Sequence, residues 1–292
     1  MARSGWRNGL EMAAAALPYA LFRSLGLERA SRLGGRLGRF IGPRLGVSRR
    51  AFRNLERALP ELGAATHARI VADMWANLGS TLAEYPHLPT IAAEPDRIEV
   101  NGIERVRALI AEGRPCIFLS GHFANWEMLI APMPRLGIQG GLIYRHANNP
   151  LADQFINGLR NRAFGMTLLP KGPKGAKEIV RLLKQKKSVA MLVDQKMNDG
   201  IEARLFGLPA MTTAAPAGLA LRYGASLIPV SIERLPGPRF RITVYDEIAV
   251  DRSADMFGEI ARLTQVINDF LESQIRARPH EWLWLHNRWR DD

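Results

Sequence analysis

The chain of 292 residues is 47% hydrophobic and 23% charged, a composition that supports a large buried core and excludes an intrinsically disordered protein. Its size fits one large α/β domain with appended helices. A single cysteine, Cys116, excludes an intramolecular disulfide framework. Because Cys116 lies in the apolar run 115–119, we interpret it as a core residue and not as a nucleophile.

The net charge of +12 is concentrated near the N-terminus. Residues 1–60 contain twelve arginines, from Arg3 to Arg57, and only three glutamates. Such a block can bind nucleic acid, anionic lipid or an acidic protein. The uncharged run 12–22 favours lipid, although it is interrupted by Pro18 and too short to span a bilayer. We therefore predict that segment 1–60 associates with a membrane through anionic lipids and that nucleic acid is not a partner.

A second amphipathic pattern occupies residues 31–58. Large apolar residues recur at helical spacing beside a strip of arginines: Leu33, Leu37, Phe40 and Ile41, with Arg32, Arg36 and Arg39. This pattern suits an anionic membrane surface, where arginines meet phosphates. An ordinary helix that packs its apolar side on the core fits as well, and glycines at 34, 35 and 38 weaken the helix prediction itself. No clear signal-peptide cleavage site follows the run 12–22, so we expect it to be retained, with its basic flank on the cytoplasmic side.

From residue 97 onward, short apolar runs alternate with helical patterns. Predicted strands are 116–119, 141–144, 166–169, 188–193, 227–233 and 240–246. Predicted helices are 10–30, 31–58, 66–85, 102–112, 125–135, 151–164, 174–185, 212–223 and 255–276. The alternation predicts an α/β fold with a mixed central sheet flanked by helices on both faces. We divide the chain into an N-terminal membrane-associating helical segment, 1–60, and an α/β domain, 61–292.

His122 follows the predicted strand 116–119, at the kind of edge where sheet enzymes place functional groups. Glu127 lies five positions further on, roughly 140° away around a helix, so the two cannot share a helical face. If His122 belongs to a loop and Glu127 to a helix that Asn125 caps, the carboxylate can approach the imidazole. Glu127 then fixes the tautomer of His122, and the other ring nitrogen takes a proton from an attacking hydroxyl. A structural histidine in the same loop fits this spacing as well.

Other chemistries fit the sequence less well. There is no Gly-x-Ser-x-Gly pattern, and the segment 172–177 lacks the spacing of a phosphate loop. His280 and His286 are too far apart in sequence for a helical metal pair, and no second cysteine assists them. We therefore expect neither a metal nor another cofactor.

Several short motifs occur in the order found in one known family. The segment 121–127, Gly-His-Phe-Ala-Asn-Trp-Glu, resembles the signature of the late acyltransferases of lipid A biosynthesis, the lauroyl/myristoyl transferases. Further similar segments are Tyr144-Arg145 with Asn148-Asn149-Pro150, Val193-Asp194-Gln195, Phe206-Gly207 and the closing run 279–289. The resemblance spans roughly residues 15–290. The sequence departs from the family in its N-terminal apolar run, which is shorter and less apolar than in many members.

The resemblance implies a glycerolipid-acyltransferase-like fold. It also implies transfer of a fatty acyl group from acyl carrier protein to a hydroxyl on a 3-hydroxyacyl chain of a lipid A precursor, at the cytoplasmic face of a bacterial inner membrane. In this reaction His122 deprotonates the hydroxyl and Glu127 stabilises the imidazolium. Arg145, at the end of a predicted strand, is the candidate donor to the tetrahedral oxyanion, or else it binds substrate phosphates or carboxylates.

Other residues are candidates to bind substrate. Asp194 ends a strand near the same edge, where it holds an arginine, binds sugar hydroxyls or forms a structural ion pair. Asn125 is either a helix cap or a contact to substrate. Lys171 and Lys174 are candidates for phosphates or for the acidic carrier protein, or they are solvated surface residues. The tryptophans of the closing run form either an interfacial aromatic belt or part of the core.

Two alternatives to a lipid A acyltransferase stay open. An enzyme of the same type can use acyl-CoA to acylate another lipid, such as a glycosylated phosphatidylinositol. A non-enzymatic basic protein that binds membranes or nucleic acid explains the arginines, but it leaves the segment 121–127 without a role.

Overall fold

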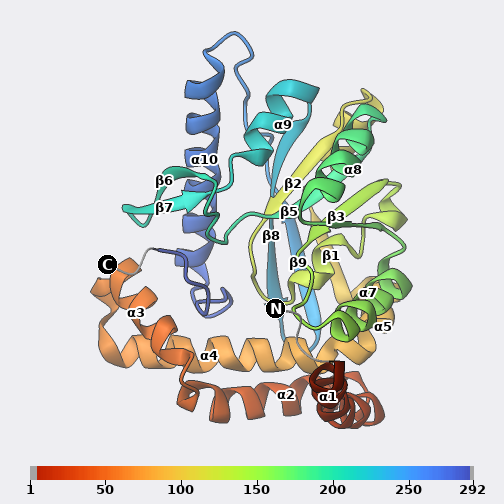
Figure 1. Cartoon of the computed structure of the whole chain (residues 1–292), viewed down its shortest axis with the longest axis vertical. Helices are drawn as coiled ribbons and strands as arrows, with labels where there is room; N and C mark the ends of the chain where they lie inside the picture. Colours follow the sequence, from red (N-terminus) through yellow and green to blue (C-terminus); the bar gives the residue numbers. More distant parts are fainter. Residues whose placement is uncertain (1–4, 290–292) are drawn as a thin grey trace.

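The computed structural model describes residues 5–289, which form an α/β fold (Figure 1). Arg3 of the basic block lies outside this range. A seven-stranded sheet in the order β1-β9-β8-β2-β5-β3-β4 is flanked by helices. All neighbouring strands are parallel except β8 and β9, so the predicted α/β class with a mixed sheet is confirmed.

The six predicted strands are all present, with ends that differ from the prediction by at most two residues. They are β2 (Cys116–Ser120), β3 (Gly140–Tyr144), β4 (Thr167–Pro170), β5 (Ser188–Leu192), β8 (Ser226–Leu235) and β9 (Arg239–Val244). The central strand β2 is buried along its whole length, as expected of a parallel strand covered on both faces. Three strands were not predicted: β1 (Ile98–Asn101) at the sheet edge and the separate hairpin of β6 (Ile201–Leu205) and β7 (Leu208–Thr212). In β1 and β6, apolar residues alternate with polar or charged ones, and β7 contains Pro209, which is unfavourable in a strand.

Ten α-helices are described between residues 5 and 289. They are α1 (Gly5–Leu25), α2 (Leu27–Ile41), α3 (Ser48–Ala58), α4 (Gly63–Glu84), α5 (Leu88–Ala93), α6 (Ile103–Ala111), α7 (Pro150–Phe164), α8 (Pro173–Lys184), α9 (Ala215–Tyr223) and α10 (Met256–Ala277). The predicted helix 31–58 is interrupted by a 3-10 turn, η1 (Gly42–Arg44), that contains Pro43. The predicted helix 125–135 is wrong: it is two 3-10 segments, η5 (Trp126–Ile130) and η6 (Pro134–Leu136). Prolines 132 and 134 lack the N–H groups that a continuous α-helix needs.

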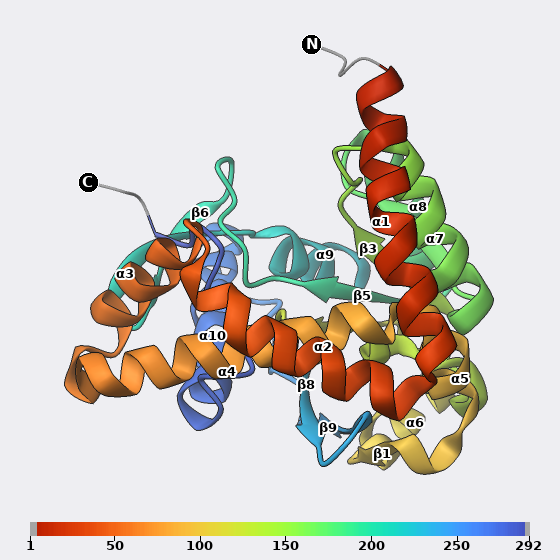
Figure 2. The same ribbon diagram turned by 90° about the horizontal axis from the view of Figure 1, so that it is seen from below.

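Helices α2 and α4 run antiparallel, in close contact, along one end of the sheet (Figures 1 and 2). A Cβ atom on Gly34 would lie 2.4 Å from the carbonyl oxygen of Gly79, and one on Gly38 would lie 2.1 Å from that of Trp75. Only glycine allows the two backbones to approach this closely. The glycines that weakened the helix prediction are therefore required for the contact between α2 and α4.

The large apolar residues in the second half of α2 face away from the core. Leu37, Phe40 and Ile41 are exposed, whereas the small residues of the opposite side are buried against α4. The alternative in which α2 packs its large apolar side on the core is therefore wrong. Helix α1 has no buried residue and extends beside α7 (Figure 2). Among residues 5–289, no helix combines the length and the apolar character needed to cross a membrane.

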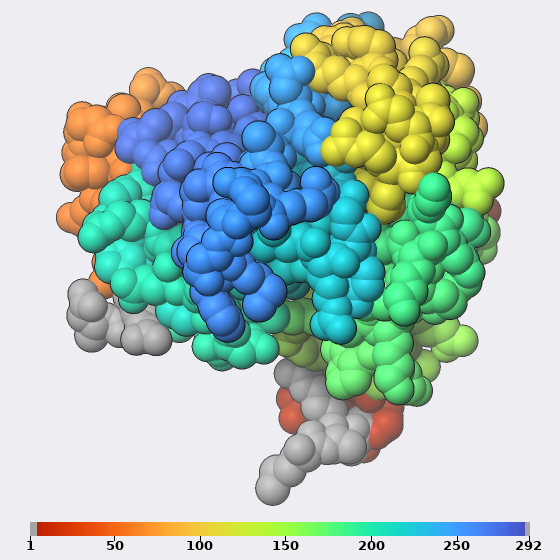
Figure 3. All heavy atoms as spheres, turned by 90° about the horizontal axis from the view of Figure 1, so that it is seen from above, coloured from red at the N-terminus to blue at the C-terminus, as the bar shows by residue number. Residues whose placement is uncertain are grey.

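The opposite face of the molecule consists mostly of segments that follow residue 100 (Figure 3). The core includes the three tryptophans of the closing run, Trp282, Trp284 and Trp289, which are at most 3% exposed. Core packing is thus the correct alternative for them. Cys116 is also buried, and burial raises its thiol pKa to about 12, which confirms that it is a core residue.

Candidate active site

Two adjacent parallel strands bring His122 and Asp194 together. Ser120 at the end of β2 pairs with Leu192 at the end of β5, and each candidate residue follows its strand by two positions. The imidazole Nδ1 of His122 lies 2.8 Å from Oδ1 of Asp194, and the backbone N–H of His122 donates to Oδ2 at 2.8 Å. The sheet itself therefore supplies His122 with a carboxylate partner.

Asp194 is fully buried, and it receives a third hydrogen bond from the indole Nε1 of Trp282 at 2.8 Å. Burial alone would raise the pKa of Asp194, but the charge and hydrogen bonds of His122 outweigh burial and hold this pKa well below its usual range. The anionic carboxylate accepts a hydrogen bond from the Nδ1–H group of His122. This arrangement fixes the tautomer that leaves Nε2 available as a base. The expectation that Asp194 contacts substrate or an arginine is wrong, because its oxygens are occupied by His122 and Trp282.

The predicted contact between Glu127 and His122 is also wrong. The buried carboxylate of Glu127 instead accepts from Arg160 on α7, with Nη2 at 2.6 Å and Nε at 2.8 Å, and from the hydroxyl of Tyr85 at 2.8 Å. Its direction follows from η5, a 3-10 segment that begins one residue before Glu127. Asn125 caps this segment, as predicted, by accepting from the backbone N–H of Glu127 at 3.3 Å.

Trp126 directly precedes Glu127 in the sequence, so the ion pair between Glu127 and Arg160 helps to hold its ring in place. That ring is 5.2 Å from the His122 ring, in an edge-to-face arrangement. Burial, and secondarily the charge of Glu127, raise the pKa of Tyr85 well above its usual range, so Tyr85 remains a proton donor. The buried contacts of Glu127 thus fix the position of η5, and with it the Trp126 ring that contacts the imidazole.

Beyond His122 lie Gln195 and His286. The amide nitrogen of Gln195 is 3.4 Å from Nε2 of His122 and 3.3 Å from Nε2 of His286. Burial, followed by the charge of His122, lowers the pKa of His286 to about 4. His286 is therefore neutral near pH 7, and the amide of Gln195 can donate one hydrogen to each imidazole. A hydroxyl that takes the place of this amide would meet Nε2 of His122 directly.

His122, Asp194 and His286 also form a group of possible metal ligands, since one atom from each lies within 4.8 Å of the others. Nδ1 of His122 and the carboxylate of Asp194 already satisfy one another, and Trp282 occupies the second carboxylate oxygen. Hydrogen bonds join these side chains into a relay: His122 is bonded to Asp194, and the Gln195 amide links His122 to His286.

The cationic candidates are not brought into contact with this relay. Arg145 is exposed after β3, a strand separated from β2 by β5, and its Nη2 is 3.4 Å from the side-chain oxygen of Asn148. Lys171 is exposed with its Nζ 3.0 Å from the sulfur of Met197, and Lys174 is exposed in the first turn of α8. Within the described part of the chain, the side chains that contact the imidazole are Trp126, Asp194, Gln195 and His286.

An apolar pocket opens beside the imidazole. The empty space between its walls, counted together with the part open to solvent, is about 560 Å³. Ser120 and Trp126 lie where the pocket approaches His122, and the walls are one face of the sheet and the segments η5 and η6. Most of this lining is aliphatic, so the pocket suits a hydrocarbon chain.

Sequence reasoning missed Arg160, Tyr85, Gln195, His286 and the role of Trp282. One signal was present: His122 and Asp194 each follow a predicted strand by a short, similar distance. Gln195 directly follows Asp194, whereas the other residues come from the end of α4, from α7 and from the closing run, whose place in space no local pattern reveals.

Comparison with known proteins agrees with the family resemblance of the sequence. The model of the family described as bacterial lipid A biosynthesis acyltransferase matches residues 10–291. A phosphatidylinositol mannoside acyltransferase of Mycobacterium tuberculosis is 26% identical over 248 residues, which cover 82% of this chain and 76% of the relative. A protein of the same description from Mycolicibacterium smegmatis is 23% identical over 200 residues, covering 68% of this chain and 64% of the relative.

Proposed function

The chain belongs to the bacterial lipid A biosynthesis acyltransferases, and we propose that it transfers a fatty acyl chain from acyl carrier protein to a 3-hydroxyacyl hydroxyl of a lipid A precursor. The proposal rests above all on one observation: a buried carboxylate orients a histidine whose ring contacts Trp126, a residue that lines an apolar pocket. A lipid hydroxyl needs a base, and an acyl chain needs such a pocket. No covalent intermediate with a protein nucleophile is required.

The proposed reaction begins when the acceptor hydroxyl displaces the Gln195 amide from Nε2 of His122. The imidazole takes the hydroxyl proton while the oxygen attacks the carbonyl carbon of the thioester. Asp194 stabilises the imidazolium through its bond to Nδ1. When the tetrahedral intermediate collapses, the C–S bond breaks and the leaving thiolate receives the proton from His122. The products are an ester and the free thiol of the carrier.

The developing oxyanion requires a donor, and we propose Arg145 for this role. It follows β3 at the carboxyl edge of the parallel strands, the same edge that carries His122 and Asp194. Its side chain is exposed, so it is available to a bound thioester. Lys171 and Lys174 are proposed to contact substrate phosphates or the acidic carrier protein from the exposed turns that follow β4.

We place the enzyme at the cytoplasmic face of the bacterial inner membrane, where anionic lipids meet its N-terminal helices. Exposed apolar residues support this proposal: Trp6, Leu10, Leu17 and Leu21 on α1, and Leu37, Phe40 and Ile41 on α2. Exposed arginines of α2 lie next to them. A surface with both features binds an anionic interface through apolar insertion and phosphate contacts.

The relatives favour a second candidate, since both are described as phosphatidylinositol mannoside acyltransferases. In that case the acceptor is a hydroxyl of a glycosylated phosphatidylinositol, and acyl-CoA is the proposed donor. The same relay and pocket serve both reactions, because both join an acyl thioester to a lipid hydroxyl.

A matrix of two donors and two acceptors separates these candidates. Purified protein is incubated with acyl carrier protein or CoA thioesters and with a lipid A precursor or phosphatidylinositol mannoside, and the products are identified by mass spectrometry. We expect an acyloxyacyl product from the carrier-protein thioester and the lipid A precursor, and none with His122→Ala. Acylation of phosphatidylinositol mannoside alone would establish the second candidate. Transfer that His122→Ala leaves intact would overturn the role of the relay.

A further inference from the structure

The loop that carries His122 has a backbone conformation that requires support. Ala124 has φ 46°, in the left-handed region that residues other than glycine rarely adopt. Its carbonyl oxygen accepts from Nδ2 of Asn77 at 3.0 Å and from the hydroxyl of Thr81 at 3.2 Å, both on α4. Its N–H donates to the carbonyl oxygen of Glu281 at 3.0 Å. The loop is thus held from two sides.

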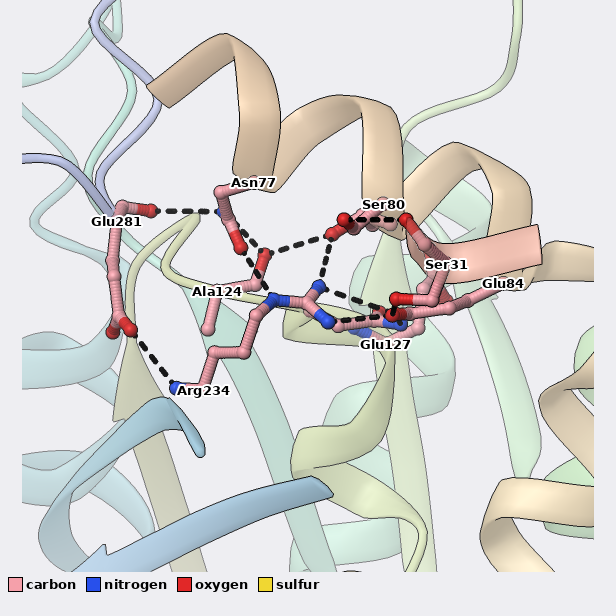
Figure 4. A network of polar contacts seen from close by, with 10 residues as sticks. Ser31, Asn77, Ser80, Glu84, Ala124, Glu127, Arg234 and Glu281 are labelled. Carbon is pink, nitrogen blue, oxygen red and sulfur yellow. Dashed lines mark hydrogen bonds and ion pairs between the residues drawn. The ribbon is translucent and has the colours of Figure 1, made fainter. Parts of the chain in front are cut away.

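An ion pair lies directly behind these contacts (Figure 4). Arg234 lies one residue before the end of strand β8. Its Nη1 is 2.5 Å from Oε1 of Glu84 at the end of α4. The same guanidinium donates to Oδ1 of Asn77 at 2.8 Å and to the hydroxyl of Thr81 at 3.0 Å. Arg234 therefore orients both side chains that bind the Ala124 carbonyl, since it occupies their acceptor atoms and leaves their donors for the loop.

Glu84 holds the other end of the loop. Its side chain is fully buried, and Oε2 accepts from Nδ2 of Asn125 at 2.8 Å. The same Asn125 caps η5 through its side-chain oxygen, so Glu84 fixes which way the amide faces. The hydroxyl of Ser31 on α2 donates to Oε1 at 2.7 Å. Glu84 thereby links α2, α4, β8 and the residue that begins η5.

Stability does not by itself account for a charged pair in this place. Burying two charges has a desolvation cost that often equals or exceeds their attraction, and apolar replacements of buried pairs are frequently neutral. The pair instead orients the side chains around it. Arg234 binds Asn77 and Thr81, which in turn bind the Ala124 carbonyl, and Glu84 binds the Asn125 amide directly. Neither charge contacts the imidazole.

We propose that Glu84 and Arg234 are positioning residues, which fix the Ala124 carbonyl and the Asn125 amide and so hold His122 against Asp194. This inference rests on the proposed function, in which His122 is the base. Displacement of a catalytic group by about 1 Å can reduce a rate ~10²-fold. Loss of the pair is therefore expected to lower kcat with little change in KM, because neither residue lines the pocket.

The test uses the full chain with Glu84→Met and Arg234→Met combined, and with Arg234→Lys as a milder change. Steady-state kinetics, thermal unfolding and proton NMR of the histidine ring N–H groups are measured for each. We expect the double variant to remain folded, with kcat reduced ~10- to 100-fold, KM within about twofold, and a weakened or exchanging Nδ1–H signal of His122. Arg234→Lys keeps the positive charge but loses the planar group of several N–H donors. Its kcat should therefore lie between those of the double variant and the unmodified chain.

Glu259→Gln is the matched control, because Glu259 is also a buried carboxylate paired with an arginine, Arg262, but belongs to α10. It should lose stability without altering kcat or the NMR signal. The positioning role is overturned if the double variant and Arg234→Lys keep a normal kcat, or if kcat falls only in proportion to the fraction unfolded. Failure of the proposed function would look different, since His122→Ala would then retain transfer whatever the pair does.

Discussion

His122 and Asp194 lie at the same distance beyond the paired ends of two parallel strands, and a 2.8 Å contact between Nδ1 and Oδ1 joins them. The pairing of β2 with β5 therefore brings the two loops that carry these side chains together. Trp282 adds a donor to the same carboxylate from the far end of the chain. Three segments separated widely in sequence thus converge on one buried anion.

Asp194→Asn should remove most of the activity while leaving the fold intact. An asparagine has nearly the same shape, but its amide can donate to Nδ1 and so favour the tautomer in which Nε2 is protonated. A base in the wrong tautomer cannot accept the hydroxyl proton, and we expect kcat to fall about 10²- to 10⁴-fold. Steady-state transfer assays and circular dichroism check this together.

Residues that act as one unit are not additive. The double variant His122→Ala with Asp194→Asn should therefore be no less active than His122→Ala alone. A further large loss in the double variant would show that Asp194 has a catalytic effect that does not pass through His122.

Most of the sheet was predictable because β2, β5 and β8 contain continuous apolar runs and β9 alternates apolar with polar residues. The candidate base, His122, was predictable for the same reason, since it follows such a run. Its partner was assigned to Glu127 because sequence reasoning considers near neighbours first, whereas strand order decides which residues meet. Once β5 is known to lie beside β2, Asp194 is the natural partner.

Glu127→Gln is expected to affect stability more than the chemical step. Glu127 is fully enclosed with Arg160 and Tyr85, and removal of one partner of a buried pair leaves the other charge uncompensated, at a cost of about 3 kcal/mol. The midpoint temperature of thermal unfolding of Glu127→Gln should therefore lie well below that of His122→Ala. The reduction of kcat should be smaller than for Asp194→Asn, since only the position of Trp126 is disturbed. A variant that is as stable as the unmodified chain but inactive would instead assign Glu127 a direct role.

Helix α2 shows why packing partners escape prediction. Its large apolar residues suggested either a membrane-facing side or a side packed on the core, but glycine and serine form the face that contacts α4. A pattern of hydrophobicity does not report close backbone approach, which depends on small residues in both helices. The links from Ser31 to Glu84 and from Arg160 to Glu127 were hidden for the same reason.

Trp282→Phe should test the indole donor while it retains an aromatic ring in the core. The change removes one of the hydrogen bonds to the Asp194 carboxylate, and a hydrogen bond to a charged group contributes about 2 kcal/mol. We expect kcat to fall roughly 10-fold, because the carboxylate gains freedom to turn away from Nδ1. Trp284→Phe is the control, since its indole donates to the carbonyl of Pro279 and not to Asp194. Equal effects of the two changes on kcat would contradict the specific role of Trp282.

The apolar pocket predicts which side chains select the acyl chain. Ala190 and Leu142 both line it from the sheet. Ala190→Leu fills part of the space and should shift the preference toward shorter chains, whereas Leu142→Ala enlarges it and should favour longer ones. Competition assays with a mixture of thioesters of different lengths, read by mass spectrometry, measure both shifts. Two variants that move the preference in the same direction, or not at all, would place the acyl chain elsewhere.

Glu281 makes the stability of the chain depend on pH. Its carboxyl group is only 5% exposed, and burial raises its pKa to about 7, against the backbone hydrogen bond from Arg234 and the charge of Arg278. Because this value is above the ordinary 4.5, the folded chain binds more protons than the unfolded chain between these two pH values. The contribution of Glu281 to stability is therefore complete below pH 4.5 and is lost as the pH rises through 7.

The difference between the unmodified chain and Glu281→Gln isolates this effect, since other titrating groups contribute equally to both. Glutamine keeps an oxygen that can accept from the N–H of Arg234, but it cannot ionise. The free energy of unfolding is measured with denaturant at a series of pH values. Between pH 4.5 and 7.5, its value for Glu281→Gln should rise relative to that of the unmodified chain by on the order of 3 kcal/mol. A difference in unfolding free energy that stays constant over this range would mean that Glu281 ionises alike in the folded and unfolded chains.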